Sequence, residues 1–208
     1  LIDMSTISPA MSAKVAEAAL KRNIDYLRAP VNGTVMQAEA GSLVILCSGP
    51  KTAHEDCLPL MEILGNKIFY IGTDEQARFL KLAINSMVGI SSSMMGEALA
   101  FGEAGGLDWN TMIDVIASSA VGSPLFNFKK ETLKKRDFTP AFTARQMAKD
   151  FDLVLDTANL KNIPMPITST VRQHWNAMIG TGRGELDYFA YVEMLEDLAG
   201  IKRSQSEN

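Results

Sequence analysis

The chain has few of the residues that build disulfide frameworks or metal sites, with only two cysteines and two histidines among 208 residues. Cys47 and Cys57 are too few and too widely spaced for a disulfide framework or a zinc knuckle. Cys47 ends an apolar run and is interpreted as a buried small side chain. His54 and His174 have no cluster of potential ligands around them in the sequence. We therefore expect no metal site.

Long apolar segments and an excess of positive charge are also missing. The longest uncharged run, Leu82 to Gly96, has 15 residues and is rich in Ser and Gly, so it is too short to span a bilayer. No basic segment precedes an apolar one near Leu1, so no signal peptide is expected. The net charge of −4 argues against a nucleic-acid partner. The interrupted basic cluster from Lys129 to Arg136 is interpreted as a solvated helix face and loop. We expect a cytoplasmic protein with no membrane or nucleic-acid partner.

A phosphate-binding glycine loop is not found either. Gly180, Gly182 and Gly184 follow a predicted helix and lack both the GxGxxG spacing and the βαβ context, so we interpret them as a turn between helices. The chain opens without an initiator methionine and within a predicted strand. We therefore expect that its beginning is missing.

What is present in residues 1–72 is an alternation of strand and helix patterns. Ser8 followed by Pro9 predicts an N-cap and the first position of a helix that runs to about Arg22. Strands are predicted over residues 1–4, 25–31, 42–47 and 67–71, with a second helix over residues 52–64, bent or restarted at Pro59. This order predicts an α/β unit whose strands form a sheet.

Beyond Gly72 the strand patterns stop and only helices are predicted. A long helix ends at Gly105-Gly106, and further helical segments cover residues 109–118, 144–161, 166–179 and 187–199, while a loop over residues 121–124 leads to a segment that ends near Arg136. We therefore predict an all-α domain over residues 73–202. Residues 203–208 are predicted to be a polar tail that frays.

The long helix carries an apolar stripe with a pair of polar side chains beside it. The stripe is formed by Leu80, Ile84, Met87, Ser91, Met94, Ala98 and Phe101, spaced alternately by four and three residues. Lys81 and Asn85 are one turn apart, about 100° around the helix from the stripe. They either point into a shared crevice or are an exposed lysine and a surface asparagine. The stripe and the helix from Tyr188 to Leu198 would serve subunit packing.

Three short polar stretches stand at positions that suit a ligand site. The segment from Asp3 to Thr6 lies where one predicted strand ends, and the segment from Ala29 to Gly33 ends the next, which is where open α/β sheets bind ligands. The third stretch, Lys149-Asp150, lies within an otherwise apolar helix. Taken singly, each has an ordinary interpretation as a helix cap, a turn or a surface ion pair.

Taken together and in this order, these stretches resemble the β-hydroxyacid dehydrogenase family. The family patterns DxST…P, APVSGG, KLxxN and KD correspond here to Asp3-Met4-Ser5-Thr6-Ile7-Ser8-Pro9, Ala29-Pro30-Val31-Asn32-Gly33-Thr34, Lys81-Leu82-Ala83-Ile84-Asn85 and Lys149-Asp150. The resemblance covers essentially the whole chain. It implies that residues 1–72 are a partial Rossmann-type sheet forming the C-terminal part of a dinucleotide-binding domain. It also implies that the long interdomain helix leads into an all-α substrate and oligomerisation domain over residues 73–202. It implies NAD or NADP as cofactor, a small hydroxyacid or semialdehyde as substrate, and assembly as a homodimer or homotetramer.

The resemblance also implies roles for individual residues. Lys81 would be the catalytic lysine, and Asn85 would help hold the substrate. Asn32 and Gly33 would line the substrate carboxylate pocket. Ser5, Thr6 and Lys149 would bind the cofactor. Of these, Thr6 would lie near the nicotinamide, and Lys149 would contact cofactor or substrate.

The chain departs from the family pattern at several places. Asn32 stands where the family usually has serine, and Glu75 and Ala77 occupy the places of the two glycines of a GxG. An asparagine amide can still donate to a carboxylate, although it changes the size and polarity of the pocket. The dinucleotide fingerprint of the family belongs to a half-domain that would precede Leu1.

The function expected from these residues is an NAD(P)-dependent oxidoreductase that interconverts a short 3-hydroxyacid and its semialdehyde by hydride transfer, with Lys81 as general acid/base. One alternative is a non-catalytic all-α oligomerisation module derived from such an enzyme. Another is an imine-reducing relative, although those family members usually lack the lysine that is present here. An open reading frame upstream of Leu1 with a strand, GxGxxG and helix would support the enzyme.

Overall fold

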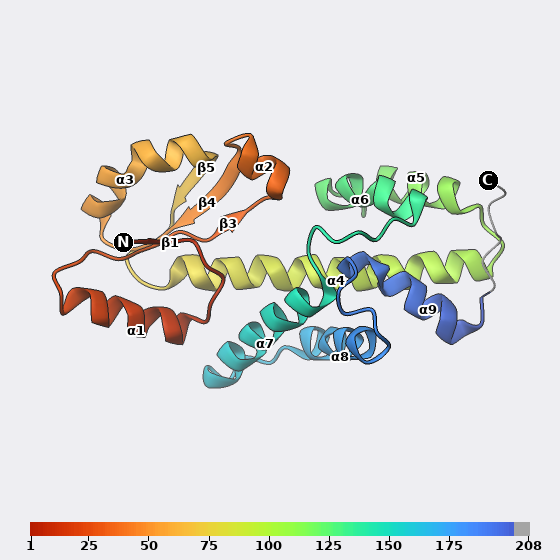
Figure 1. Ribbon diagram of the computed structural model, residues 1–208. Coiled ribbons are helices and arrows are strands. Elements are labelled where there is room, and N and C mark those ends of the chain that lie inside the picture. The colour runs from red at the N-terminus through yellow and green to blue at the C-terminus, as the bar shows by residue number, and fades with distance from the viewer. Residues whose placement is uncertain (202–208) are drawn as a thin grey trace. The chain divides into compact units, whose positions relative to one another are not determined.

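The computed structural model describes residues 1–201, which divide into two compact units. Unit 1 comprises Leu1–Ser86 and Asp150–Met165, and unit 2 comprises Met87–Lys149 and the residues from Pro166 onward. Two long helices, α4 (Gln76–Ala104) and α7 (Ala144–Leu160), contribute residues to both units (Figure 1). The division into domains at residues 72 and 73 stays a prediction, and the predicted polar tail lies outside the described residues.

Unit 1 is an α/β unit with short strands. Strand β1 (Ile2–Asp3) pairs in parallel with β2 (Leu27–Arg28), and α1 (Pro9–Leu20), which lies within the first predicted helix, connects them. A second sheet contains β3 (Val31–Asn32), β4 (Leu43–Cys47) and β5 (Gly65–Tyr70), in which β4 and β5 are parallel. Helices α1 and α3 (Lys51–Leu64) lie on opposite sides of the strands (Figure 1). The predicted partial Rossmann-type fold class is confirmed.

The predicted strand over residues 25–31 is instead two short strands separated by Ala29 and Pro30. Proline has no N–H to donate and fixes φ, so the ladder is interrupted there. The chain then turns, and β3 pairs antiparallel with β4, bringing Asn32 opposite Val44. Asn32 therefore belongs to a strand, although the predicted strand stopped at residue 31.

The core of unit 1 is made by the side chains between these strands and α3. Its fully buried members are Leu27, Ala29, Leu43, Ile45, Cys47, Ala53 and Met61. Burial raises the pKa of the Cys47 thiol to about 11, which agrees with its interpretation as an inert buried side chain. Helix α3 continues through Pro59.

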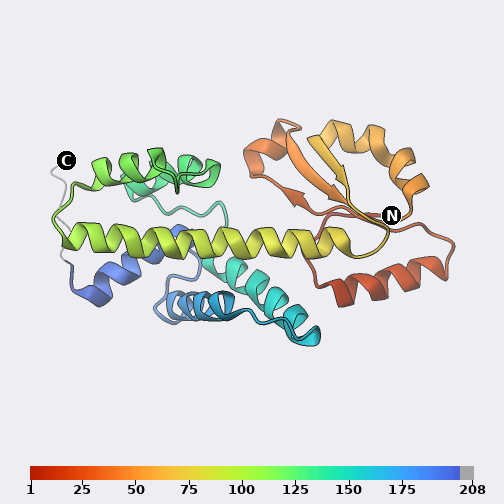
Figure 2. The ribbon, with the colours of Figure 1, turned by 180° about the vertical axis from the view of Figure 1, so that it is seen from behind.

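Unit 2 is all-helical in its described part. Besides residues of α4 and α7 it contains α5 (Trp109–Ser118), α6 (Pro124–Lys135), α8 (Pro166–Gly180), the short 3₁₀ helix η1 (Tyr188–Ala190) and α9 (Tyr191–Ala199), as seen in Figure 2. Asp108 and Ser123 begin α5 and α6 by accepting hydrogen bonds from the backbone N–H groups of Thr111 at 2.8 Å and Phe126 at 3.2 Å. These caps satisfy donors that a helix start leaves without partners.

The apolar stripe of α4 is present, but its large side chains face outward. Met87 is 67% exposed, Met94 is 49% exposed and Phe101 is 85% exposed. The buried face of α4 in unit 2 combines Met95 and Leu99 with small residues, among them Gly96, where an added Cβ would lie 2.8 Å from the Tyr191 ring. The small side chain allows the neighbouring helix to approach closely. The predicted helical periodicity is thus correct, but the apolar stripe is not the buried face of the helix.

The basic cluster also differs from its prediction at one residue. Lys129 is only 3% exposed and forms a 2.6 Å ion pair with Asp187, which is fully buried. The interpretation as a solvated face is therefore wrong for Lys129, because a buried acid lies within its reach. Along the described residues, no helix combines the length and apolarity needed to cross a membrane.

Candidate functional site

Lys81 and Asn32 are brought together in unit 1. Lys81 lies in the second turn of α4, is partly buried, and its Nζ donates a 2.8 Å hydrogen bond to the Oδ1 atom of Asn32. The neighbouring Leu82 is buried and holds this part of the helix against the unit. The ammonium group of Lys81 thus lies at the end of β3 and is not directed into bulk solvent.

Gly33 gives the end of β3 a backbone shape that other residues rarely adopt. Its φ is +145°, and an added Cβ would lie 2.6 Å from the Cδ2 atom of Leu43. A side chain here would meet both backbone strain and a steric clash. The glycine therefore keeps the chain beside Asn32 close to β4, and it leaves backbone uncovered next to the lysine.

Asn85 lies one turn beyond Lys81 and is held by an acid that the sequence analysis gave no role. Its Nδ2 donates a 2.6 Å hydrogen bond to the Oδ2 atom of Asp150, which is 1% exposed on α7. This contact fixes the orientation of the amide group. Two signals in the sequence pointed to Asp150, its place beside Lys149 in an otherwise apolar helix and the KD pattern of the family, but neither gave it a role.

The other predicted cofactor residues occupy two separate segments. Ser5 is exposed and Thr6 is partly buried in the turn between β1 and α1, where the Ser5 N–H donates to the Oδ1 atom of Asp3 at 2.9 Å. Lys149 is exposed on α7 and belongs to unit 2, whereas Asp150 belongs to unit 1. The roles of all three residues stay predictions.

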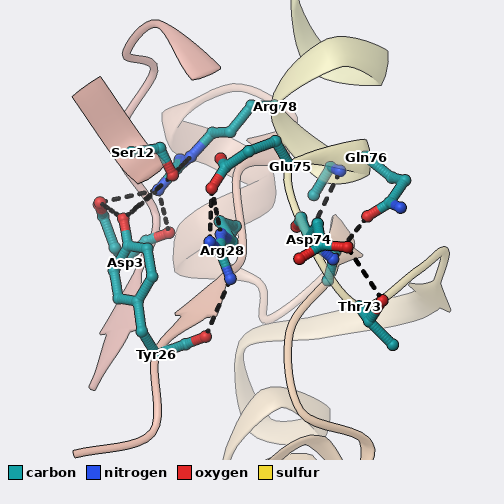
Figure 3. A network of polar contacts seen from close by, with 11 residues as sticks. Asp3, Ser12, Tyr26, Arg28, Thr73, Asp74, Glu75, Gln76 and Arg78 are labelled. Atoms are coloured by element: carbon teal, nitrogen blue, oxygen red, sulfur yellow. Dashed lines mark hydrogen bonds and ion pairs between the residues drawn. The ribbon is translucent and has the colours of Figure 1, made fainter. Parts of the chain in front are cut away.

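Four polar side chains form a cluster behind the turn that carries Ser5 (Figure 3). Arg78 is 1% exposed in the first turn of α4 and forms a 2.7 Å ion pair with Asp3. Tyr26 donates a 2.5 Å hydrogen bond to the same carboxylate and accepts one of 3.0 Å from Arg78. Ser12 accepts a 3.3 Å hydrogen bond from the Nε atom of Arg78.

This cluster changes the acidity of two of its members. Burial by itself raises the pKa of Asp3, but the hydrogen bonds from Tyr26 and Ser5 and the charge of Arg78 outweigh it and hold the pKa below its usual value. Burial and the bond to Asp3 raise the pKa of Tyr26. Asp3 therefore stays ionised and Tyr26 stays neutral around pH 7.

Glu75, which stands where the family usually has a glycine, forms a second ion pair in Figure 3. The Oε1 atom of Glu75 accepts hydrogen bonds from Arg28 at 2.9 Å and 2.5 Å, and the two side chains are 14% and 7% exposed. A glycine at this position could not neutralise a buried arginine. In residues 1–201, no group of three His, Cys, Asp or Glu side chains is arranged to hold a metal ion.

Comparisons with known proteins agree with the motifs found in the sequence. Residues 76–195 match the family described as NAD-binding of NADP-dependent 3-hydroxyisobutyrate dehydrogenase. Residues 1–72 match the NAD binding domain of 6-phosphogluconate dehydrogenase. Both descriptions confirm NAD or NADP as the cofactor of the family.

Individual relatives cover nearly the whole chain. The chain is 30% identical over 205 residues to 2-(hydroxymethyl)glutarate dehydrogenase of Eubacterium barkeri, covering 98% of this chain and 68% of the relative. It is 29% identical to glyoxylate/succinic semialdehyde reductase 1 of Arabidopsis thaliana, covering 94% and 68%. The crystal structure of 3-hydroxyisobutyrate dehydrogenase from Salmonella typhimurium superimposes with a TM-score of 0.87 at 26% identity, covering 93% and 68%.

The two matched families together account for most of the chain, and the named relatives are dehydrogenases and reductases. The chain belongs to the β-hydroxyacid dehydrogenase family of NAD(P)-dependent oxidoreductases.

Proposed function

We propose that the protein containing this chain interconverts a short 3-hydroxyacid and its semialdehyde by hydride exchange with NAD or NADP, and that Lys81 is its general acid/base. The observation that carries the proposal is the 2.8 Å hydrogen bond between Lys81 Nζ and Asn32 Oδ1. It places a proton donor at the end of β3, beside residues that can hold a small anion.

The reaction requires a group that stabilises negative charge on the substrate oxygen and exchanges a proton with it. A bound reduced nicotinamide would supply hydride to the carbonyl carbon, and negative charge would then develop on the carbonyl oxygen. The Lys81 ammonium stabilises this charge and donates a proton to the oxygen. In the reverse direction, the neutral amine accepts the proton of the hydroxyl group. Asn32, whose oxygen accepts from Nζ, orients the amine in both directions.

Recognition of the substrate carboxylate is assigned to Asn32, Gly33 and Asn85. Asn32 can turn its amide N–H groups toward an anion, and the backbone at Gly33 is not covered by a side chain. The bond from Asn85 to Asp150 leaves a second amide N–H on the same nitrogen. Neutral amides suit this role because they hold the anion without competing with Lys81 for the developing charge.

Binding of the dinucleotide is assigned to Ser5, Thr6 and Lys149, in the turn after β1 and on α7. NAD binding is the property by which both matched families are described. The hydroxyl groups of Ser5 and Thr6 can contact the nicotinamide carboxamide or ribose. Lys149 is an exposed cation suited to a phosphate or carboxylate group.

The experiment that tests the proposal uses the product of the complete reading frame. Short hydroxyacids and semialdehydes are supplied with NAD(H) or NADP(H), and the absorbance of the reduced nicotinamide is followed. We expect turnover with one of the two nicotinamide cofactors and with acids that carry the hydroxyl group on C3, the carbon β to the carboxylate. Dinucleotide binding without turnover of any such acid would contradict the proposal and favour a non-catalytic module or imine reduction.

We also propose that the protein is a homodimer or homotetramer, with a second copy covering the outward face of α4 in unit 2. Phe101 and two residues that line a hollow with it, Leu107 and Val115, are each at least 59% exposed. Hollows of about 330 and 270 Å³ adjoin Phe101, and their linings are almost entirely apolar. A contiguous apolar surface of this kind marks an interface.

Replacing Phe101 by glutamate should therefore lower the mass measured by sedimentation equilibrium to that of a smaller assembly. A charge at the centre of the buried interface has no partner, and its desolvation opposes association. Leu20→Glu is the matched control, because Leu20 is 74% exposed on α1, away from this surface in the sequence and in a different unit. An unchanged mass for Phe101→Glu would exclude this face as the interface.

A further inference from the structure

Arg78 is the residue that connects the turn after β1 to the helix that carries Lys81. Its Nη1 atom donates to the backbone carbonyl of Ser5, and its Nη2 atom donates to the carbonyl of Asp3 at 3.2 Å. The guanidinium thus binds two backbone carbonyl groups of the same turn. On α4, Arg78 precedes Lys81 by three residues, which is about 4.5 Å along the helix axis.

The remaining contacts of Arg78 fix the guanidinium itself. Nε donates to the Ser12 hydroxyl on α1 at 3.3 Å, and Nη2 donates to the Tyr26 hydroxyl at 3.0 Å. The Oδ2 atom of Asp3 lies 2.7 Å from Nη2 and neutralises the charge of the guanidinium (Figure 3). All three nitrogens have partners, and the side chain is 1% exposed. Arg78 is therefore not placed to bind a phosphate or carboxylate of a ligand, and its action must pass through the residues it holds.

We propose that Arg78 is a positioning residue, which fixes the backbone of the Asp3–Ser5 turn and thereby the placement of Ser5 and Thr6 for the dinucleotide. The inference rests on the proposed function of Ser5 and Thr6. The planar fork of the guanidinium is what the geometry requires, because one flat group contacts two carbonyls, a carboxylate and two hydroxyls. A lysine would match the charge of Asp3 with a single nitrogen and could not hold both carbonyls.

The test compares Arg78→Met and Arg78→Lys with the unaltered complete protein. We expect both variants to raise the KM for the dinucleotide by about 10- to 100-fold, as a misplaced binding group does. The KM for the hydroxyacid should change much less, because Asn32 and Gly33 are held by β3 and β4. Recovery of the unaltered dinucleotide KM in Arg78→Lys would overturn the proposal and show that only the charge opposite Asp3 matters.

A matched control separates positioning from general loss of stability. Met61 is fully buried in the core of unit 1 and does not belong to the polar cluster. Met61→Ala should lower the melting temperature by leaving a cavity, yet keep the dinucleotide KM of the unaltered protein. If Met61→Ala raises this KM as much as Arg78→Met does, the effect is one of stability and the proposal is wrong.

A second measurement does not depend on enzyme activity. Amide hydrogen exchange of residues 3–8 in the unliganded protein should be accelerated about 10-fold or more in Arg78→Met and remain unchanged in Met61→Ala, since exchange follows local opening. Accelerated exchange in a protein that turns over no hydroxyacid would refute the proposed function while retaining the structural role of Arg78. Unaltered exchange in Arg78→Met would refute the positioning role whatever the activity.

Discussion

Replacing Lys81 by methionine should lower kcat for hydroxyacid oxidation by about 10²–10⁴-fold, the range that general acid–base catalysis contributes. Methionine has a similar length and cannot donate or accept the proton of the substrate hydroxyl. The loss should fall on kcat more than on the KM of the dinucleotide, since the lysine acts on the reacting oxygen. Steady-state kinetics of the complete protein with saturating cofactor measure the effect.

Two further variants show whether the proton or only the charge is required. Lys81→Arg keeps the positive charge but does not release a proton near neutral pH, so we expect it to remain severely impaired. Asn32→Ala removes the partner that accepts the 2.8 Å bond from Nζ but leaves the amine, and its kcat should fall less. Near-normal kcat in Lys81→Met would eliminate Lys81 as the acid/base.

Much of the site was predictable because its parts are local in the sequence. The i,i+4 spacing of Lys81 and Asn85 fixes them one turn apart on any α-helix, and their helix was indicated by its periodicity. The APVSGG-like segment ends near a strand because Pro30 interrupts the ladder and Gly33 allows a φ of +145°. Family resemblance then joined segments that spacing alone could not connect. The contact between Lys81 and Asn32 agrees with that placement.

The parts that were not predicted depend on contacts between distant segments. A period of 3.6 shows that a helix has two faces, but it does not say which of them packs inward. On α4, Met95, Leu99 and Gly96 face inward, whereas Met87 and Met94 face outward. Arg78 gave no signal because its partners are up to 75 residues away in the sequence. Lys129 was indistinguishable from its solvated lysine neighbours until Asp187 was placed beside it.

The buried ion pair of Lys129 and Asp187 should make Lys129→Met the most destabilising single change among the charged residues of unit 2. The Asp187 carboxylate is fully buried, and its Oδ2 atom accepts a 2.6 Å hydrogen bond from Lys129 Nζ. It also begins η1 by accepting from the Phe189 N–H at 3.1 Å. Removing the lysine leaves an unpaired charge without access to water, which costs about 3–5 kcal/mol of unfolding free energy.

Urea unfolding of Lys129→Met, Asp187→Asn and the double variant tests this prediction. Asparagine keeps an oxygen that can begin η1 but carries no charge, so the double variant should be more stable than Lys129→Met alone. A coupling energy of about 1–3 kcal/mol between the two sites is expected for groups in direct contact. The aromatic rings of Tyr188 and Phe189, whose centroids lie 5.1 and 5.6 Å from Lys129 Nζ, contribute to stability but cannot replace the missing charge. Additive effects of the two substitutions would show that the pair is not energetically coupled, and Lys129 would then act through its packing alone.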